Sequence, residues 1–67
     1  PSAAQKKVYL IDKKASADVI AEVIEKAKAE REKGIIVAIN IMKKNKKFQK
    51  EQLMADGYEE IEMIYAD

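Results

Sequence analysis

The chain has 67 residues, of which 48% are hydrophobic and 37% charged, and this composition is typical of one small folded domain. It contains no Cys, His, Thr or Trp, which excludes disulfides, thiolate nucleophiles, zinc fingers and a histidine base. The 13 basic and 12 acidic residues leave a net charge of +1, so no strong overall attraction to nucleic acid or to a membrane is expected.

The first six residues are mostly polar or small, and we expect a flexible lead-in to a single domain over residues 7–67. Residues 1–10 show no apolar stretch of a signal peptide, and the lack of Cys fits a reducing, cytoplasmic setting. Residues 8–11 are a short apolar run between Lys7 and Asp12, which predicts the first strand.

Residues 16–33 show the clearest helical pattern. Ser16 is a natural N-cap, because its hydroxyl can accept a hydrogen bond from a free backbone N–H. Gly34 can adopt the left-handed conformation that ends a helix. Apolar residues recur at the spacing of one helix face and give one apolar stripe of Ile20, Val23, Ile24 and Ala27.

Residues 35–42 form the most apolar run of the chain, interrupted by Asn40. The run follows a helix-ending glycine and has the length of a strand, so it predicts a strand buried on both faces and therefore central in a sheet. It is far shorter than the ~20 residues that a membrane span needs, so no membrane partner is expected.

The last third of the chain predicts a shorter helix and a final strand. Asn45 can cap a helix over residues 46–56, and Gly57 can end it. Residues 58–65 alternate in polarity, which predicts a half-buried edge strand with Glu60 and Glu62 on a solvent-exposed face. The inward side of the helix is expected to consist of Phe48, Leu53 (or Gln52) and Met54 or Ala55.

These elements predict an α/β fold of the order β-α-β-α-β, with a three-stranded, mainly parallel sheet and two helices. Strand order 1-2-3 would place both helices on one face, whereas order 2-1-3 would place them on opposite faces. The apolar second strand favours order 1-2-3, which leaves one face bare. That face is expected to form a homodimer or to bind a protein partner through Tyr9, Ile11, Ile36 and Ile64.

Lysines gather where the predicted parallel strands end. The loops after the first two strands combine basic residues with two helix N-termini, an arrangement that favours anions. No glycine-rich phosphate motif accompanies them, and the alternative interpretation is a solvated loop. The candidate anion or nucleic-acid site, in residues 43–50, consists of Lys43, Lys44, Lys46, Lys47 and Lys50. Against nucleic acid, Phe48 is expected in the core, and Arg31 is the one arginine.

No group of residues in the sequence predicts catalysis. The acidic pairs near the C-terminus are expected to be solvated, since a chain of this size has little room for a cleft. Pro1 resembles the N-terminal proline base of the tautomerase family, but the expected first strand begins later and the arginine partners of that family are missing. We therefore expect no enzyme activity, no cofactor and no metal, with chemistry of the Pro1 amine as the one exception to test.

The sequence resembles the style of idealised, de novo designed small α/β proteins, and no natural family is recognised over its length. Both glycines follow predicted helices, Ser16 precedes one, and the long helix is built mainly from Ala, Glu, Lys, Ile and Val. The resemblance implies a non-catalytic folded scaffold with no evolved ligand. The alternative is a natural small binding module. It would act on a protein through the open sheet face or an edge strand, or on nucleic acid through residues 43–50.

Overall fold

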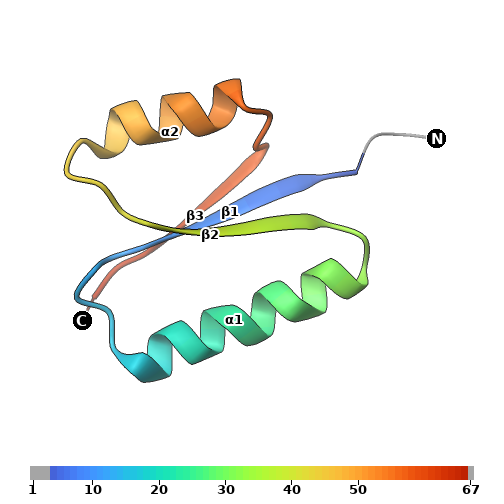
Figure 1. Cartoon of the computed structure of the whole chain (residues 1–67), viewed down its shortest axis with the longest axis horizontal. Helices are drawn as coiled ribbons and strands as arrows, with labels where there is room; N and C mark the ends of the chain where they lie inside the picture. Colours follow the sequence, from blue (N-terminus) through green and yellow to red (C-terminus); the bar gives the residue numbers. More distant parts are fainter. Residues whose placement is uncertain (1–3, 67) are drawn as a thin grey trace.

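A computed structural model describes residues 4–66 of the chain. Strands and helices alternate along it (Figure 1), so the predicted β-α-β-α-β order is confirmed. The elements are β1 (Lys6–Ile11), α1 (Ala17–Glu32), β2 (Ile36–Ile41), α2 (Lys46–Ala55) and β3 (Glu60–Ile64). Every bound lies within two residues of the one expected from sequence.

The three strands are parallel and lie in the order β2-β1-β3. This confirms the alternative order 2-1-3, and the preference for a central second strand is wrong. β1 is central and its Val8 and Leu10 are fully buried, whereas Ile36 and Ile41 of β2 remain 49% and 57% exposed. The apolar run misled because apolar composition does not tell how many strands flank a strand, and β2 lies at an edge where only part of it is covered.

The central position of β1 places the two helices on opposite faces of the sheet (Figure 1). Crossovers between parallel strands are right-handed. The first runs from β1 to β2 and the second runs back past β1 to β3, so the two cross the sheet in opposite directions and each face receives one helix. One core cluster, beneath α1, consists of Tyr9, Ile11, Val23, Ala27 and Val37. The other, on the α2 face, consists of Val8, Leu10, Met42 and Leu53.

Over residues 4–66 each face of the sheet carries one helix, so the residues assigned to a bare face need correction. Tyr9 and Ile11 are buried beneath α1, and Ile64 packs against the same cluster. Ile36 is half-exposed, but it lies on the edge strand β2. The proposed partner-binding set is thus divided between the core and one edge of the sheet.

The predicted helix ends are confirmed. Ser16 Oγ accepts a hydrogen bond from Val19 N at 3.2 Å, and Asn45 Oδ1 accepts one from Phe48 N at 3.1 Å. Gly34 and Gly57 have φ values of 89° and 96°, which other residues adopt only with strain. Neither of the helices in residues 4–66 is long and apolar enough to cross a membrane.

The inward face of α2 differs from the predicted one. Gln49 and Leu53 are buried, whereas Phe48 and Met54 are 58% and 64% exposed. The face is rotated because Gln49 enters the interior, where its amide bonds to the backbone of β2 and of the following loop. Sequence patterns treat glutamine as a surface residue, so they could not find this position.

Candidate functional site

The loops that follow β1 and β2 enclose a basic hollow of about 390 Å³ at the carboxyl edge of the sheet. The two strands are neighbours, but α1 and α2 leave them toward opposite faces (Figure 1). This is the position at which open parallel sheets bind ligands. The hollow is lined by Asp12, Lys13, Lys14, Met42, Lys43, Lys44 and Lys46. Five lysines against one aspartate give it a strongly positive charge.

The structure places only part of the predicted basic site around this hollow. Lys43, Lys44 and Lys46 line it, whereas Lys47 and Lys50 lie farther along α2 and do not. Lys13 and Lys14 join from the β1–α1 loop, as expected for loops at one sheet edge. The charge therefore comes from two loops, and not from one continuous segment.

Backbone hydrogen bonds hold both loops of the hollow in place. Met42 N donates to Ile11 O at 2.8 Å, which continues the β1–β2 pairing into the rim. Asp12 Oδ1 accepts a hydrogen bond from Lys14 N at 2.8 Å, so this carboxylate closes its own turn. On the other side, Gln49 Oε1 accepts from Lys43 N at 2.8 Å. The lysine side chains thus project from a fixed backbone.

A second hollow of about 620 Å³ lies beside the first, between β2 and α2. Phe48 lines it, and Lys43 lines both hollows. The expectation that Phe48 belongs to the core is wrong, because Leu53 and Gln49 occupy the inward side of α2. Its ring stays open to a ligand next to the basic rim.

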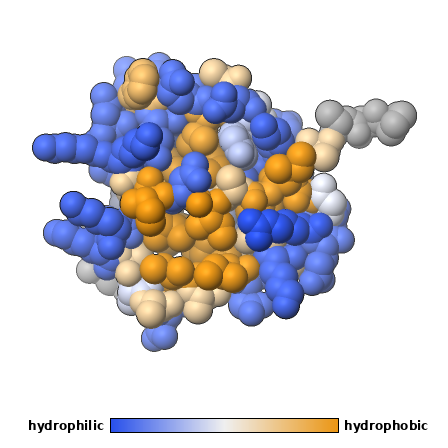
Figure 2. Space-filling model, in the orientation of Figure 1, coloured by the Kyte–Doolittle hydropathy of each residue, from blue (hydrophilic) through white to orange (hydrophobic). Residues whose placement is uncertain are grey.

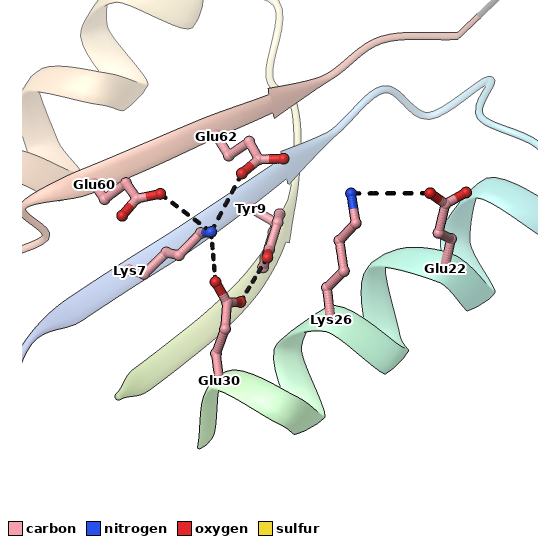
Figure 3. Close-up of polar contacts among 7 residues, drawn as sticks. All are labelled: Lys7, Tyr9, Glu22, Lys26, Glu30, Glu60 and Glu62. Atoms are coloured by element: carbon pink, nitrogen blue, oxygen red, sulfur yellow. Dashed lines mark hydrogen bonds and ion pairs between the residues drawn. The ribbon is translucent and has the colours of Figure 1, made fainter. Parts of the chain in front are cut away.

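A partly buried ionic cluster lies on the α1 face of the sheet (Figure 3), and none of its residues lines either hollow. Lys7 Nζ lies 2.7 Å from a carboxylate oxygen of Glu30, 3.1 Å from one of Glu60 and 3.2 Å from one of Glu62. The hydroxyl of Tyr9 donates to the other oxygen of Glu30 at 2.5 Å. The Lys7 side chain is only 7% exposed, so these carboxylates replace its water.

Sequence analysis missed the ionic cluster and placed Glu60 and Glu62 on a solvated face. The parallel register pairs Lys7 with Glu60 and Tyr9 with Glu62, so all four side chains share the α1 face. Alternation along each strand was the available signal: position 7 shares a face with 9, and 60 with 62. Only the strand order reveals that the two strands are neighbours.

The cluster shifts the pKa of three of its members. Burial alone would lower the pKa of Lys7, but the bonds to Glu30, Tyr9, Glu60 and Glu62 outweigh burial and raise it. Burial and the bond to Glu30 raise the pKa of Tyr9 despite the nearby Lys7. Burial acts to raise the pKa of Glu30, yet the bonds from Lys7 and Tyr9 lower it below its usual range. Each group is thus held in the protonation state that binds its neighbours.

The remaining sequence expectations concern metals and catalysis. In residues 4–66, no group of three or more His, Cys, Asp or Glu side chains could hold a metal ion. Pro1, the candidate for amine chemistry, lies outside the described residues. No protein-family model, curated protein or solved structure matches this chain. Its own surfaces and contacts are therefore the basis for a functional proposal.

Proposed function

We propose that the chain is a non-catalytic folded scaffold, as its resemblance to designed α/β proteins implies. The observation that carries this proposal is that the residues with shifted pKa values do not line either hollow. Lys7, Tyr9 and Glu30 have shifted pKa values, but they bind one another and none lines either hollow. An enzyme would place such groups where a substrate can reach them.

Thermal unfolding tests the scaffold proposal. Idealised designs are typically hyperstable, so we expect a Tm above about 90 °C. Circular dichroism at several chain concentrations measures it. A midpoint near the 45–65 °C of ordinary mesophilic domains, about 25 °C or more below expectation, would contradict the proposal.

A second candidate function, sequence-independent binding of single-stranded nucleic acid, is favoured by the position of Phe48. Five lysines around the hollow can follow a phosphate backbone, and the exposed Phe48 ring beside Lys43 can stack on a base. Arg31, which could read a base edge, is held at the carbonyl of Val37. Binding would therefore show little preference for sequence.

Fluorescence anisotropy with a labelled single strand of about 10 nucleotides tests the second function. We expect Lys43→Ala/Lys44→Ala to weaken binding and to reduce its salt dependence, because each phosphate contact releases counterions. The matched control is Lys28→Ala/Lys33→Ala, which removes the same charge from exposed positions elsewhere. A chain that fails to bind at about 50 mM salt, or equal losses in both variants, would exclude this function.

Phe48→Leu separates stacking from charge at the same site. The residue is 58% exposed, so the substitution should leave the fold intact. Base stacking contributes about 1–3 kcal/mol, so affinity should fall at least fivefold with an unchanged salt slope. An unchanged affinity would show that the ring does not contact the strand.

A further inference from the structure

The outward edge of β2 has a regular set of backbone groups. Ile36 N donates to Gln5 O and Met42 N donates to Ile11 O, each at 2.8 Å, so alternate residues of β2 face β1. The intervening residues therefore direct their N–H and C=O groups away from the sheet. These residues are Val37, Ile39 and Ile41.

Two side chains occupy carbonyls of this edge. Arg31, in the last turn of α1, donates to Val37 O from Nη2 at 2.7 Å and from Nε at 3.3 Å. Gln49, near the start of α2, donates from Nε2 to Ile41 O at 3.0 Å and is 6% exposed. The two helices thus each contribute one side chain that closes one end of the β2 edge.

Apolar side chains flank the same edge. Figure 2 shows this hydrophobic surface along β2 and the adjoining side of α1. The exposed fractions are 37% for Ile20, 49% for Ile24, 49% for Ile36, 57% for Ile41 and 58% for Phe48. A stable interface buries about 800 Å² per partner, or about a sixth of the 4913 Å² surface of this chain. The edge strand together with its flanking side chains provides a surface of the right kind.

We propose that the β2 edge is a latent interface for β2 of a second copy, which Arg31 and Gln49 keep closed. Antiparallel pairing centred on Ile39 would join Val37 of one copy to Ile41 of the other. Those residues carry the two carbonyls that Arg31 and Gln49 already occupy. While the two side chains stay in place, an incoming N–H must compete with them at both of these carbonyls, and only the central Ile39 pair meets no such competition.

Charge selects β2 of the second copy over its β3. β2 carries no charged residue, so two copies meet without repulsion. β3 carries Glu60 and Glu62, which are 50% and 39% exposed and would lie beside an uncharged, apolar strand. Pairing of β2 with β2 is also two-fold symmetric and closes as a dimer, whereas pairing of β2 with β3 would continue as a fibre.

The test is the solution mass of Arg31→Met/Gln49→Leu from micromolar to millimolar concentration. Methionine keeps an unbranched apolar stem at position 31 and removes the guanidinium. We expect the mass to rise from the 7.6 kDa of one chain toward twice that value, while the unsubstituted chain stays at 7.6 kDa. Should the double variant fail to fold, Arg31→Met alone keeps the test, because position 31 is exposed.

Two further variants separate pairing at β2 from nonspecific aggregation. Lys28→Met removes the same charge from an exposed position of α1 and should stay at the mass of one chain. Ile39→Pro, added to the double variant, removes an N–H that points away from β1, so it should restore that mass. The proposal is overturned if the folded double variant remains a single chain, if Ile39→Pro leaves its association unchanged, or if the unsubstituted chain is already dimeric.

Discussion

The two edges of the sheet are closed by different physical means. On β3, Glu60 and Glu62 place negative charge beside the strand, and Lys7 binds both. On β2, the strand is uncharged, and Arg31 and Gln49 occupy two of its three outward carbonyls. Charged side chains disfavour an approaching strand in any register, because pairing would take them out of water, whereas side-chain hydrogen bonds protect only the carbonyls that they reach.

The position of α1 explains why the edges differ. α1 packs over β1 and β2, so Val37 is 7% exposed and an acidic residue there would lose its water. The same face of β3 is less covered, and the Glu60 side chain remains 50% exposed. An edge strand covered by a helix must therefore be protected against pairing by uncharged residues or by side-chain hydrogen bonds. An uncovered edge strand can be protected by charged residues.

The largest expected effect comes from removing Lys7, the cation of the ionic cluster that binds the carboxylates of β3. Lys7→Met removes the cation from Glu30 in a partly buried position and leaves it only the Tyr9 hydroxyl, and it also frees Glu60 and Glu62. Removal of one member of a buried ion pair destabilises by about 3–5 kcal/mol, and we expect about 3 kcal/mol because two of the three partners reach water. Urea unfolding measures this loss.

The matched control for Lys7→Met is the neighbouring Lys6→Met. Lys6 donates to Asp56 O at 2.6 Å and lies over the Tyr58 ring, but on the opposite face and in an exposed contact. We expect this variant to lose at most about 1 kcal/mol. Equal losses at positions 6 and 7 would show that the ionic cluster contributes nothing beyond an ordinary surface lysine.

The pH dependence of stability should come from Lys7 and Tyr9 of β1 and Glu30 of α1, whose pKa values are shifted. The pKa of Glu30 is lowered from its usual 4.5, so its contribution is present above that pH and is lost as pH falls through the lowered value. The pKa values of Lys7 and Tyr9 are raised from 10.5 and 10.0, so their contributions persist below pH 10 and are lost as pH rises further.

Glu30→Gln isolates the acid half of this dependence. Urea unfolding of both chains at a series of pH values should show the largest difference in stability at neutral pH. The difference should shrink toward zero in acid, where Glu30 of the parent chain is protonated. A difference that is constant with pH would contradict the assigned role of the carboxylate. Dimerisation of Arg31→Met/Gln49→Leu should not follow the same titration.

Sequence reasoning found the elements and their ends because those signals are local. Ser16, Asn45, Gly34 and Gly57 each act within one turn of their own position, and all four behave as predicted. Strand order depends on which surfaces meet across the sheet, and the apolar run at residues 35–42 favoured the wrong centre.

The candidate site was predicted only in part for the same reason. Lys43, Lys44 and Lys46 needed only the rule that parallel strands end at one edge. The contacts of Lys7, Arg31 and Gln49 depend on strand order or on a polar side chain turned inward. Neither feature can be predicted from the hydrophobic periodicity of the sequence.

A smaller effect is expected when the acidic residues of β3 are removed. Glu60→Gln/Glu62→Gln takes two partners from Lys7 but leaves Glu30, the nearest of the three at 2.7 Å. Exposed ion pairs contribute about 0.2–1 kcal/mol each, so unfolding should require about 1 kcal/mol less. The charge-matched control is Glu22→Gln/Glu25→Gln, at two exposed positions of α1. Urea unfolding measures both double variants. Equal losses of stability would contradict the contribution of Glu60 and Glu62 to the ionic cluster.

The smallest expected effect is a local change in hydrogen exchange at the β2 edge, which distinguishes the N-cap of α2 from the N-cap of α1. Asn45→Ala and Ser16→Ala each remove one capping bond, and each should lower stability by about 1 kcal/mol. Only Asn45 caps the turn that carries Gln49, whose N donates to Asn45 O at 3.1 Å. Fraying of this turn should loosen the bond from Gln49 to Ile41 O. The amide of Lys43 reports on it, because Lys43 N donates to the same Gln49 side chain. Hydrogen exchange at Lys43 should therefore accelerate in Asn45→Ala but not in Ser16→Ala. Equal acceleration in both variants would mean that exchange follows global stability, and Gln49 would then not be a local closure of this edge.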